Sequence, residues 1–317
     1  MKDVLLDANF PRDAQGRTYH VGTKAGQVAN RIITVGDHVR ARRVVESSFD
    51  GGQALFEFES QRNFLTLTGT VRGVPITVVA IGMGFSLVDF FVRECAAVVS
   101  GDLVIVRLGS CGSLSSDAPI GSVVVPRASV GVTRNYDYFH PSTTAEERAS
   151  GSIEPYTITK PLDCDGEVHD ALVRSLQATL PPADPALFGG APPRALGNIT
   201  NASADSFYSS QGRQTSLFVD ANANLAAVLQ ERVPQLQTFE METFLLNHLA
   251  AAVDEGAKGG RIRTGAAQMV FANRTTQQFI TPHEVDVLER WAGRAVCEAL
   301  VAIDIAPERL QKEGVWN

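Results

Sequence analysis

Short apolar runs rich in β-branched residues alternate along this chain with segments of helical periodicity. The runs with strand character cover residues 31–35, 54–59, 64–70, 75–81, 103–106, 121–125, 195–200 and 266–271. Apolar residues recur at helical spacing over 88–99 and again over 288–299. Strands that alternate with helices are typical of an α/β fold with a largely parallel core.

Composition and charge narrow the classes of function. The chain has 317 residues, 44% of them hydrophobic, which is enough for one large domain or two small ones. The net charge of -7 disfavours a nucleic-acid partner, since binding to a phosphate backbone needs a positive field. The four cysteines form no CxxC pair, so we expect no zinc site and no disulfide framework. No other metal and no cofactor are expected.

Targeting signals are not visible in the sequence. Residues 1–17 are polar and hold no long apolar segment, so no signal peptide is predicted. No uncharged apolar run approaches the length of a membrane span. We therefore expect a cytoplasmic protein with no membrane partner.

The chain divides into a flexible N-terminal extension over 1–18, a single domain over 19–306 and a surface tail over 307–317. Residues 141–193 are rich in Ser, Thr, Pro and Gly and are predicted to be an insertion, with one helix over 166–180. The last helix has a capping box, formed by Thr281 and Glu284, which predicts its start.

Two segments carry arginines that suit an anion. Gly36 ends a predicted strand just before a helix, where a backbone N–H can approach a phosphate. Arg40 falls in the first turn of that helix, where a cation opposes the helix dipole and calls for an anion, although a plain surface helix would explain the basic run 40–43. Asp37 is expected to cap the helix.

Arg107 is the second arginine. It follows the apolar run 103–106, which places it at the expected carboxyl end of a buried strand, where ligands of α/β sheets collect. Gly109 and Ser110 would supply a tight turn and a hydroxyl donor. A buried arginine needs a partner, so a structural ion pair and an anion site are both compatible with this segment.

The segment 207–213 carries groups that suit a flat heterocycle. Phe207 can stack on a ring, the Gln211 amide can both donate to and accept from its edge, and Arg213 can donate to a carbonyl. This pattern suits uracil better than a purine. A core phenylalanine and a polar loop would explain the same residues.

Glu240-Met241-Glu242 offers two carboxylates and a thioether near a predicted helix start. A carboxylate can accept from both hydroxyls of a ribose diol, while Met packs on the apolar face of the sugar. Acidic residues that stabilise the first turn of a helix beginning at Glu240 are the simpler interpretation.

Together these motifs resemble the type I nucleoside phosphorylases, and within them the uridine phosphorylases, from about Tyr19 to the last helix. The resemblance implies a three-layer α/β/α sandwich around a mixed, partly barrel-like sheet. It gives phosphate binding to Gly36, Arg40, Arg107 and Ser110, uracil binding to Phe207, Gln211 and Arg213 with support from Arg274, and ribose binding to Met241 and Glu242.

The resemblance also implies a homodimer that shares its sites. His20 resembles a histidine that reaches the ribose of the neighbouring subunit, and Arg62 resembles an arginine that completes the neighbouring phosphate site. Bacterial members carry Glu where this chain has Asn63, so the cation that they bind between subunits is in doubt.

The reaction implied is the reversible phosphorolysis of uridine to uracil and ribose 1-phosphate, with Arg107, Gln211, Arg213 and Glu242 as the catalytic set. A purine or broad-specificity phosphorylase, a nucleosidase that uses water, and a nucleoside-binding protein without turnover remain alternatives. Three candidate phosphate arginines disfavour the nucleosidase, and the Gln211–Arg213 pair disfavours a purine. Selectivity among uridine, deoxyuridine and thymidine stays open.

Overall fold

The computed structural model describes residues 5, 7–190, 192–254 and 260–317. The strands are β1 Arg31–Val35, β2 Phe56–Glu59, β3 Leu65–Val71, β4 Val74–Ala80, β5 Leu103–Ser113, β6 Val123–Arg134, β7 Tyr156–Ile158, β8 Leu162–Asp163, β9 Ala195–Ala204, β10 Leu236–Glu240, β11 Ile262–Asn273 and β12 Gln278–Phe279. The α-helices are α1 His38–Ser48, α2 Phe85–Ala96, α3 Ala145–Ala149, α4 Gly166–Ala178, α5 Leu225–Arg232, α6 Thr243–Ala251 and α7 Pro282–Ala302.

The strands form one mixed sheet, part of which closes on itself. β5 pairs in parallel with β11 and antiparallel with β10, and the path from β11 through β6, β9 and β10 returns to β5. β1, β4, β3 and β2 extend from the other part of β5 as an open sheet. The mixed, partly barrel-like sheet that the resemblance implied is confirmed.

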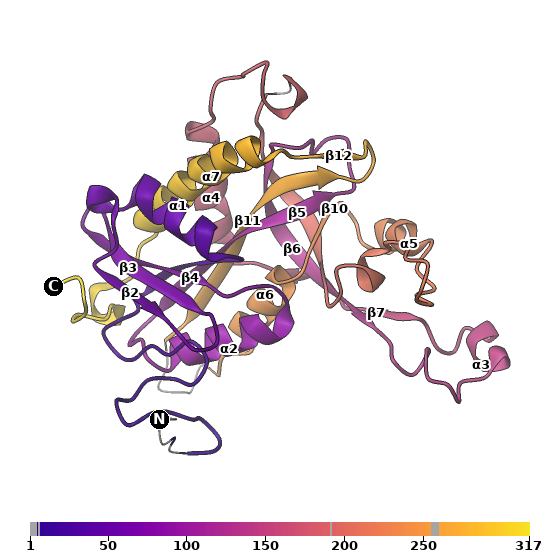
Figure 1. Ribbon diagram of the computed structural model, residues 1–317, viewed down its shortest axis with the longest axis horizontal. Coiled ribbons are helices and arrows are strands. Elements are labelled where there is room, and N and C mark those ends of the chain that lie inside the picture. Colours follow the sequence, from indigo (N-terminus) through magenta and orange to yellow (C-terminus); the bar gives the residue numbers. More distant parts are fainter. Residues whose placement is uncertain (1–4, 6, 191, 255–259) are drawn as a thin grey trace.

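Helices cover both faces of this sheet (Figure 1). α1, α4 and α7 lie on one face, and α2 and α6 lie on the other. The alternation of side chains along a strand explains the two cores: Ile33 belongs to the first and Ile32 to the second. Both residues are fully buried. The three-layer α/β/α arrangement is therefore the one expected.

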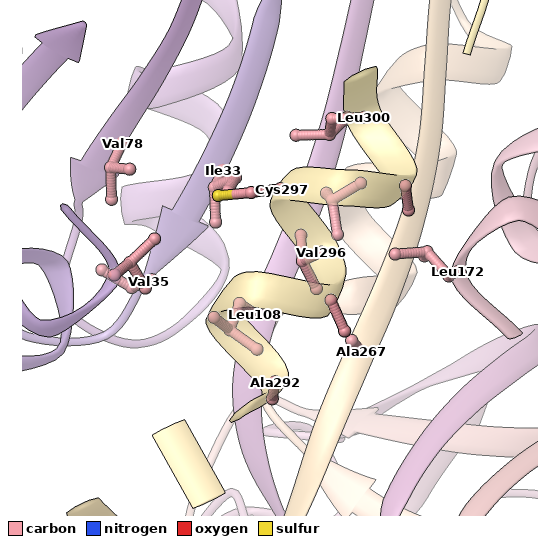
Figure 2. Close-up of a cluster of buried hydrophobic side chains, with 14 of the residues drawn as sticks. Ile33, Val35, Val78, Leu108, Leu172, Ala267, Ala292, Val296, Cys297 and Leu300 are labelled. Atoms are coloured by element: carbon pink, nitrogen blue, oxygen red, sulfur yellow. The ribbon is translucent and has the colours of Figure 1, made fainter. Parts of the chain in front are cut away.

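α7 is the central helix of the first core. Its Ala292, Val296 and Leu300 point toward the sheet and toward Leu172 of α4 (Figure 2). Thr281 and Glu284 form the predicted capping box at its start. This packing fixes which side of α7 faces α1.

Two predictions about local structure were wrong. β5 does not end at residue 106 but continues to Ser113, because β11 pairs with it along its whole length, so Arg107 and Ser110 lie within a strand and not at its end. Glu240 does not open a helix: it is the last residue of β10, a strand that pattern reading missed, and α6 begins at Thr243.

The segment 141–193 contains α3, β7, β8 and α4. α4 matches the predicted helix and buries Val168, Leu172 and Leu176 in the first core. The division of the chain into 1–18, 19–306 and 307–317 stays a prediction. Among the helices of the described ranges, none combines the length and the apolar character that a bilayer crossing requires.

Candidate active site

A cavity of about 310 Å³ lies where the open sheet meets the closed part, at the carboxyl end of β1. Nine of the predicted site residues line it: Gly36, Arg40, Arg107, Ser110, Phe207, Gln211, Arg213, Met241 and Glu242. They come from segments up to about two hundred residues apart in the chain, and the fold brings them together around one cavity. His20, Arg62 and Arg274 are not part of its lining.

Two arginines converge on Gly36 at one end of the cavity. A Cβ placed on Gly36 would lie 3.6 Å from Nη2 of Arg107 and 3.6 Å from Nη1 of Arg40. Both side chains are buried, at 3% and 6% exposure. The missing side chain of this glycine therefore leaves a space that is bounded by two cations. Asp37 caps α1 as expected, because its Oδ1 accepts from the backbone N–H of Arg40 at 2.8 Å.

Arg107 is only partly satisfied by the protein. Its Nη2 donates to Oε2 of Glu242 at 2.9 Å, while its Nε and Nη1 are buried without a hydrogen-bond partner in the described part of the chain. Burying a charged donor unpaired is costly, so two unpaired donor nitrogens on an arginine that lines a cavity indicate a place for acceptor oxygens. Arg107 lies opposite Thr34, one residue before β1 ends, so its side chain reaches the cavity from within a strand.

Glu242 lines the cavity and is the partner of Arg107. Its other oxygen, Oε1, accepts from the backbone N–H of Gly84 at 2.6 Å. Burial raises the pKa of Glu242 above its ordinary value, although Arg107 opposes that shift. The carboxylate is thus held rigidly by one cation and one backbone donor.

Glu240 has a structural task that the sequence interpretation did not separate from that of Glu242. Its Oε2 accepts from the backbone N–H groups of Glu242 and Thr243, and its Oε1 accepts from Asn201 at 2.7 Å. The carboxylate of a strand residue therefore caps α6 and orients Glu242. Glu240 also lines the cavity, but both of its oxygens are bonded within the protein.

The opposite end of the cavity is built from the short 3₁₀ segment η3, Ser209–Gln211, and the residues that flank it. Arg213 Nη1 donates to Oε1 of Gln211 at 2.6 Å, and the Arg213 guanidinium lies 3.7 Å from the ring centre of Phe207. Burial, with help from Arg274, lowers the pKa of Arg213 to about 10. Phe207 thus stacks on Arg213 here, and its stacking on a base stays a prediction.

Arg274 binds the backbone of this segment. Its Nη1 donates to the carbonyl of Gln211, and its Nη2 donates to the carbonyl of Gly212 at 3.3 Å. Arg274 follows directly after β11, so these contacts connect the η3 segment to the closed part of the sheet. Its part in uracil binding stays a prediction.

A second clamp on the same segment was not found from the sequence. Arg134, the last residue of β6, donates to Oγ of Ser209 at 2.6 Å and to Oδ1 of Asp220 at 2.5 Å. The Tyr156 hydroxyl also contacts Ser209 Oγ, at 2.8 Å. The side chain of Arg134 bonds residues that lie 75 or more positions further along the chain, so no local pattern reveals these contacts.

Other lining residues were also missed. Met83 and Phe279 are about 70% exposed and line the cavity, as do Phe239 and Phe271 from β10 and β11. Phe239 lies in the strand that pattern reading missed, while Phe271 lies in β11, two residues before its end. Aromatic residues at strand ends were the available signal.

His20 and Arg62 lie together elsewhere on the same chain. His20 Nδ1 contacts Glu94 at 2.7 Å and its ring stacks on Phe90 at 3.8 Å. Arg62 donates to the Tyr19 hydroxyl. Neither reaches the cavity of its own chain, so their roles at a neighbouring subunit stay predictions.

The chain belongs to the phosphorylase superfamily, whose family model matches residues 30–302. The fold and the cavity define, more specifically, a nucleoside phosphorylase type of α/β enzyme, a pentosyltransferase.

The chain is similar to uridine phosphorylases over nearly its whole length and to a purine nucleoside phosphorylase over about a third of it. The chain is 28% identical to a uridine phosphorylase of Thermococcus kodakarensis over 100% of this chain and 98% of that protein. A solved structure from a study of two uridine phosphorylases in the oomycete Phytophthora capsici is 37% identical, with a TM-score of 0.85 over 95% of this chain and 100% of that one. A DeoD-type purine nucleoside phosphorylase of Myxococcus xanthus is 35% identical, but over only 34% of this chain and 44% of that protein.

Proposed function

We propose that this enzyme catalyses the reversible phosphorolysis of uridine to uracil and ribose 1-phosphate. The observation that carries the proposal is that Arg107, whose Nε and Nη1 have no partner in the described part of the chain, lines the same cavity as Gln211 and Arg213. The full-length likeness to uridine phosphorylases supports the same substrate.

In this proposal, phosphate lies beside Gly36 and accepts from Arg40 and Arg107. Ser110, which also lines the cavity, adds a hydroxyl donor. A dianion fixed there is placed to attack C1′ of the ribose, and its charge stabilises the oxocarbenium character that the sugar gains as the glycosidic bond lengthens. Phosphate is a co-substrate, and no step is assigned to a metal or a cofactor.

The ribose lies between the two ends, with Met241 on its apolar face and Glu242 at its hydroxyls. Glu242 is bonded to Arg107, so the group that holds the sugar and the group that holds the nucleophile share one ion pair. This arrangement favours a fixed distance between the phosphate oxygen and C1′, which is the main contribution that positioning makes to rate.

The bonding electrons leave with N1 of uracil, and negative charge spreads to the carbonyl oxygens of the base. Arg213 and the Gln211 amide stabilise that charge by hydrogen bonding. A planar guanidinium already oriented by Phe207 and Gln211 needs little reorganisation to do so.

The proposal includes a homodimer in which His20 and Arg62 complete the site of the neighbouring subunit. Its basis is that both side chains lie outside the cavity of their own chain, close to one another through Tyr19. In the complete site, Arg62 adds a third cation to the phosphate end.

The test is the ultraviolet change on mixing the protein with uridine, first with phosphate and then after its rigorous removal. Cleavage that depends on phosphate supports phosphorolysis. Cleavage without phosphate identifies a nucleosidase and contradicts the proposal. Turnover of inosine in place of uridine contradicts the uracil assignment of Gln211 and Arg213, and binding of uridine without any cleavage identifies a non-catalytic protein.

A further inference from the structure

Glu289 is a buried carboxylate that stands one layer behind the cavity. It lies on α7, is 2% exposed and does not line the cavity. Its Oε1 accepts from Nε of Arg40 at 2.7 Å, across 249 positions of sequence. The phosphate end of the cavity is therefore connected to the C-terminal helix through a single side chain.

The contact decides which part of Arg40 is available to a ligand. A guanidinium is planar, so fixing the direction of Nε also fixes the directions of Nη1 and Nη2. With Nε bound to Glu289, Nη1 lies near Gly36, and Nη2 lies 3.6 Å from Oδ2 of Asp37. Glu289 thus binds Nε of Arg40, while Nη1 stays near Gly36 at the cavity.

Arg40 also needs this partner in order to stay buried. It occupies the first turn of α1, where the helix dipole is unfavourable to a cation. A guanidinium with 6% exposure in that place requires a counter-charge. Glu289 provides it from a helix whose rotation is fixed by the packing of Ala292 and Val296 (Figure 2).

The second oxygen of Glu289 prevents the carboxylate from turning. Oε2 accepts from Nη1 of Arg43 at 2.7 Å, and Nε of Arg43 contacts Asp286 at 2.9 Å. α1 and α7 are thus joined by two arginines and two carboxylates. Of these four side chains, only Arg40 lines the cavity.

We propose that Glu289 is a positioning residue for phosphate, acting through Arg40; this rests on the proposed phosphorolysis. The two possible roles of Glu289 predict opposite changes in phosphate affinity when its charge is removed. If Glu289 acted only as a nearby negative charge, its neutralisation would strengthen the binding of an anion. If it acts by orienting Arg40, the same neutralisation weakens phosphate binding.

The test is Glu289→Gln, which keeps the shape of the side chain and removes its charge. The KM for phosphate is expected to rise about tenfold or more, as for the loss of one charge-assisted contact, while the KM for uridine changes less than about twofold. A phosphate KM that is unchanged or lower overturns the proposal. Glu298→Gln is the matched control, because Glu298 also lies on α7 but pairs with Arg72, outside the Arg40–Glu289–Arg43 network, and both KM values should stay at those of the wild type.

Two further measurements separate positioning from damage to the fold. In an Arg40→Met background, Glu289→Gln should cause no additional rise in the phosphate KM; a further rise of the same size overturns action through Arg40. Arg40→Lys keeps the charge but not the fork and should show the same phosphate-selective defect, even if Glu289→Gln does not fold. An Arg40→Lys enzyme with normal phosphate KM overturns the proposal.

Uridine cleavage by the wild type distinguishes a failure of the proposed phosphorolysis from a failure of the positioning role of Glu289. A wild-type protein that does not cleave uridine with phosphate contradicts the proposed function. Calorimetric titration of wild type, Glu289→Gln and Arg40→Lys with inorganic phosphate then tests Glu289 directly, with weaker binding expected for both variants. Equal binding by all three overturns the positioning role.

Discussion

Arg107 and Glu242 form a buried ion pair of 2.9 Å although they lie 135 positions apart. The side chain of Arg107 is 3% exposed and that of Glu242 is 5% exposed. One comes from the middle of β5 and the other from the residue before α6. Glu242 takes the Nη2 donor that lies near Gly36, while Nε and Nη1 of Arg107 have no partner among the described residues.

Arg107→Ala should abolish phosphorolysis, since it removes the unpaired donors. It also leaves Glu242 buried without its cation, which should lower the free energy of unfolding by about 3–5 kcal/mol. Phosphate-dependent uridine cleavage by the purified variant is the measurement. Arg127→Ala, at an arginine that is 45% exposed and outside the cavity, is the control and should be fully active. Near-normal turnover of Arg107→Ala would refute its phosphate role.

Gly36→Ala should raise the KM for phosphate by about tenfold or more, because the new methyl group occupies the space between the two guanidinium groups. The backbone tolerates alanine there, and the nearest atoms lie at an ordinary contact distance of 3.6 Å. The melting temperature should therefore stay close to that of the wild type. A parallel rise in the uridine KM would show that the methyl group disturbs the whole cavity.

Gln211→Ala should weaken uracil binding about tenfold to a hundredfold, the usual cost of about 1–3 kcal/mol for a lost directed hydrogen bond. Phosphate binding should hardly change, and both are measured by calorimetry. Gln214→Ala is the matched control: Gln214 bonds Asn222 in the same loop but does not line the cavity. An equal loss for both ligands would move Gln211 out of the base site.

Arg213→Met should lower the affinity for uracil at little cost in stability. Burial lowers the pKa of Arg213 to about 10, which means that the fold disfavours its charged form. The unfolded chain then binds the proton more tightly than the native one, so the wild type should gain stability relative to Arg213→Met as the pH rises through about 10, from about 9 to 11. Urea unfolding at several pH values measures this, and an opposite trend contradicts the shift.

Arg134→Met serves as the contrast, because Arg134 at the end of β6 holds the same loop. It removes the clamp on Ser209 and Asp220 and should cost about 2–3 kcal/mol of unfolding free energy, as for a partly buried charged network. The same urea experiment compares the two variants. If Arg213→Met proved the more destabilising, Arg213 would be primarily structural.

Mixing two inactive variants tests the shared site. Arg62→Ala and Arg107→Ala should each be inactive alone. After unfolding and refolding together, mixed dimers contain one site with both arginines intact, so about a quarter of wild-type activity should return for random pairing of a two-fold dimer. No recovery, with mixed dimers present, would place Arg62 outside the neighbouring site.

The sequence predicted most strand positions from local patterns, and its motifs and family resemblance pointed to nine of the residues that line the cavity. β1 was predicted residue for residue, and nine site residues meet in one cavity. Arg107 was misplaced because the length of β5 is set by its pairing with β11, which no local pattern contains. Glu289 and Arg134 were missed because their partners are 75 to 249 positions away.

β11 is also the strand that completes the closed part of the sheet, and it lies between residues 262 and 273. Its pairing with β5 spans about 160 positions, the kind of non-local parallel contact that forms slowly. During synthesis, the apolar strand that carries Arg107 must therefore wait with one edge open, and open apolar edges are sites of misassembly. The same pairing that places the arginine beside its ligand makes folding of this enzyme depend on nearly the whole chain having been made.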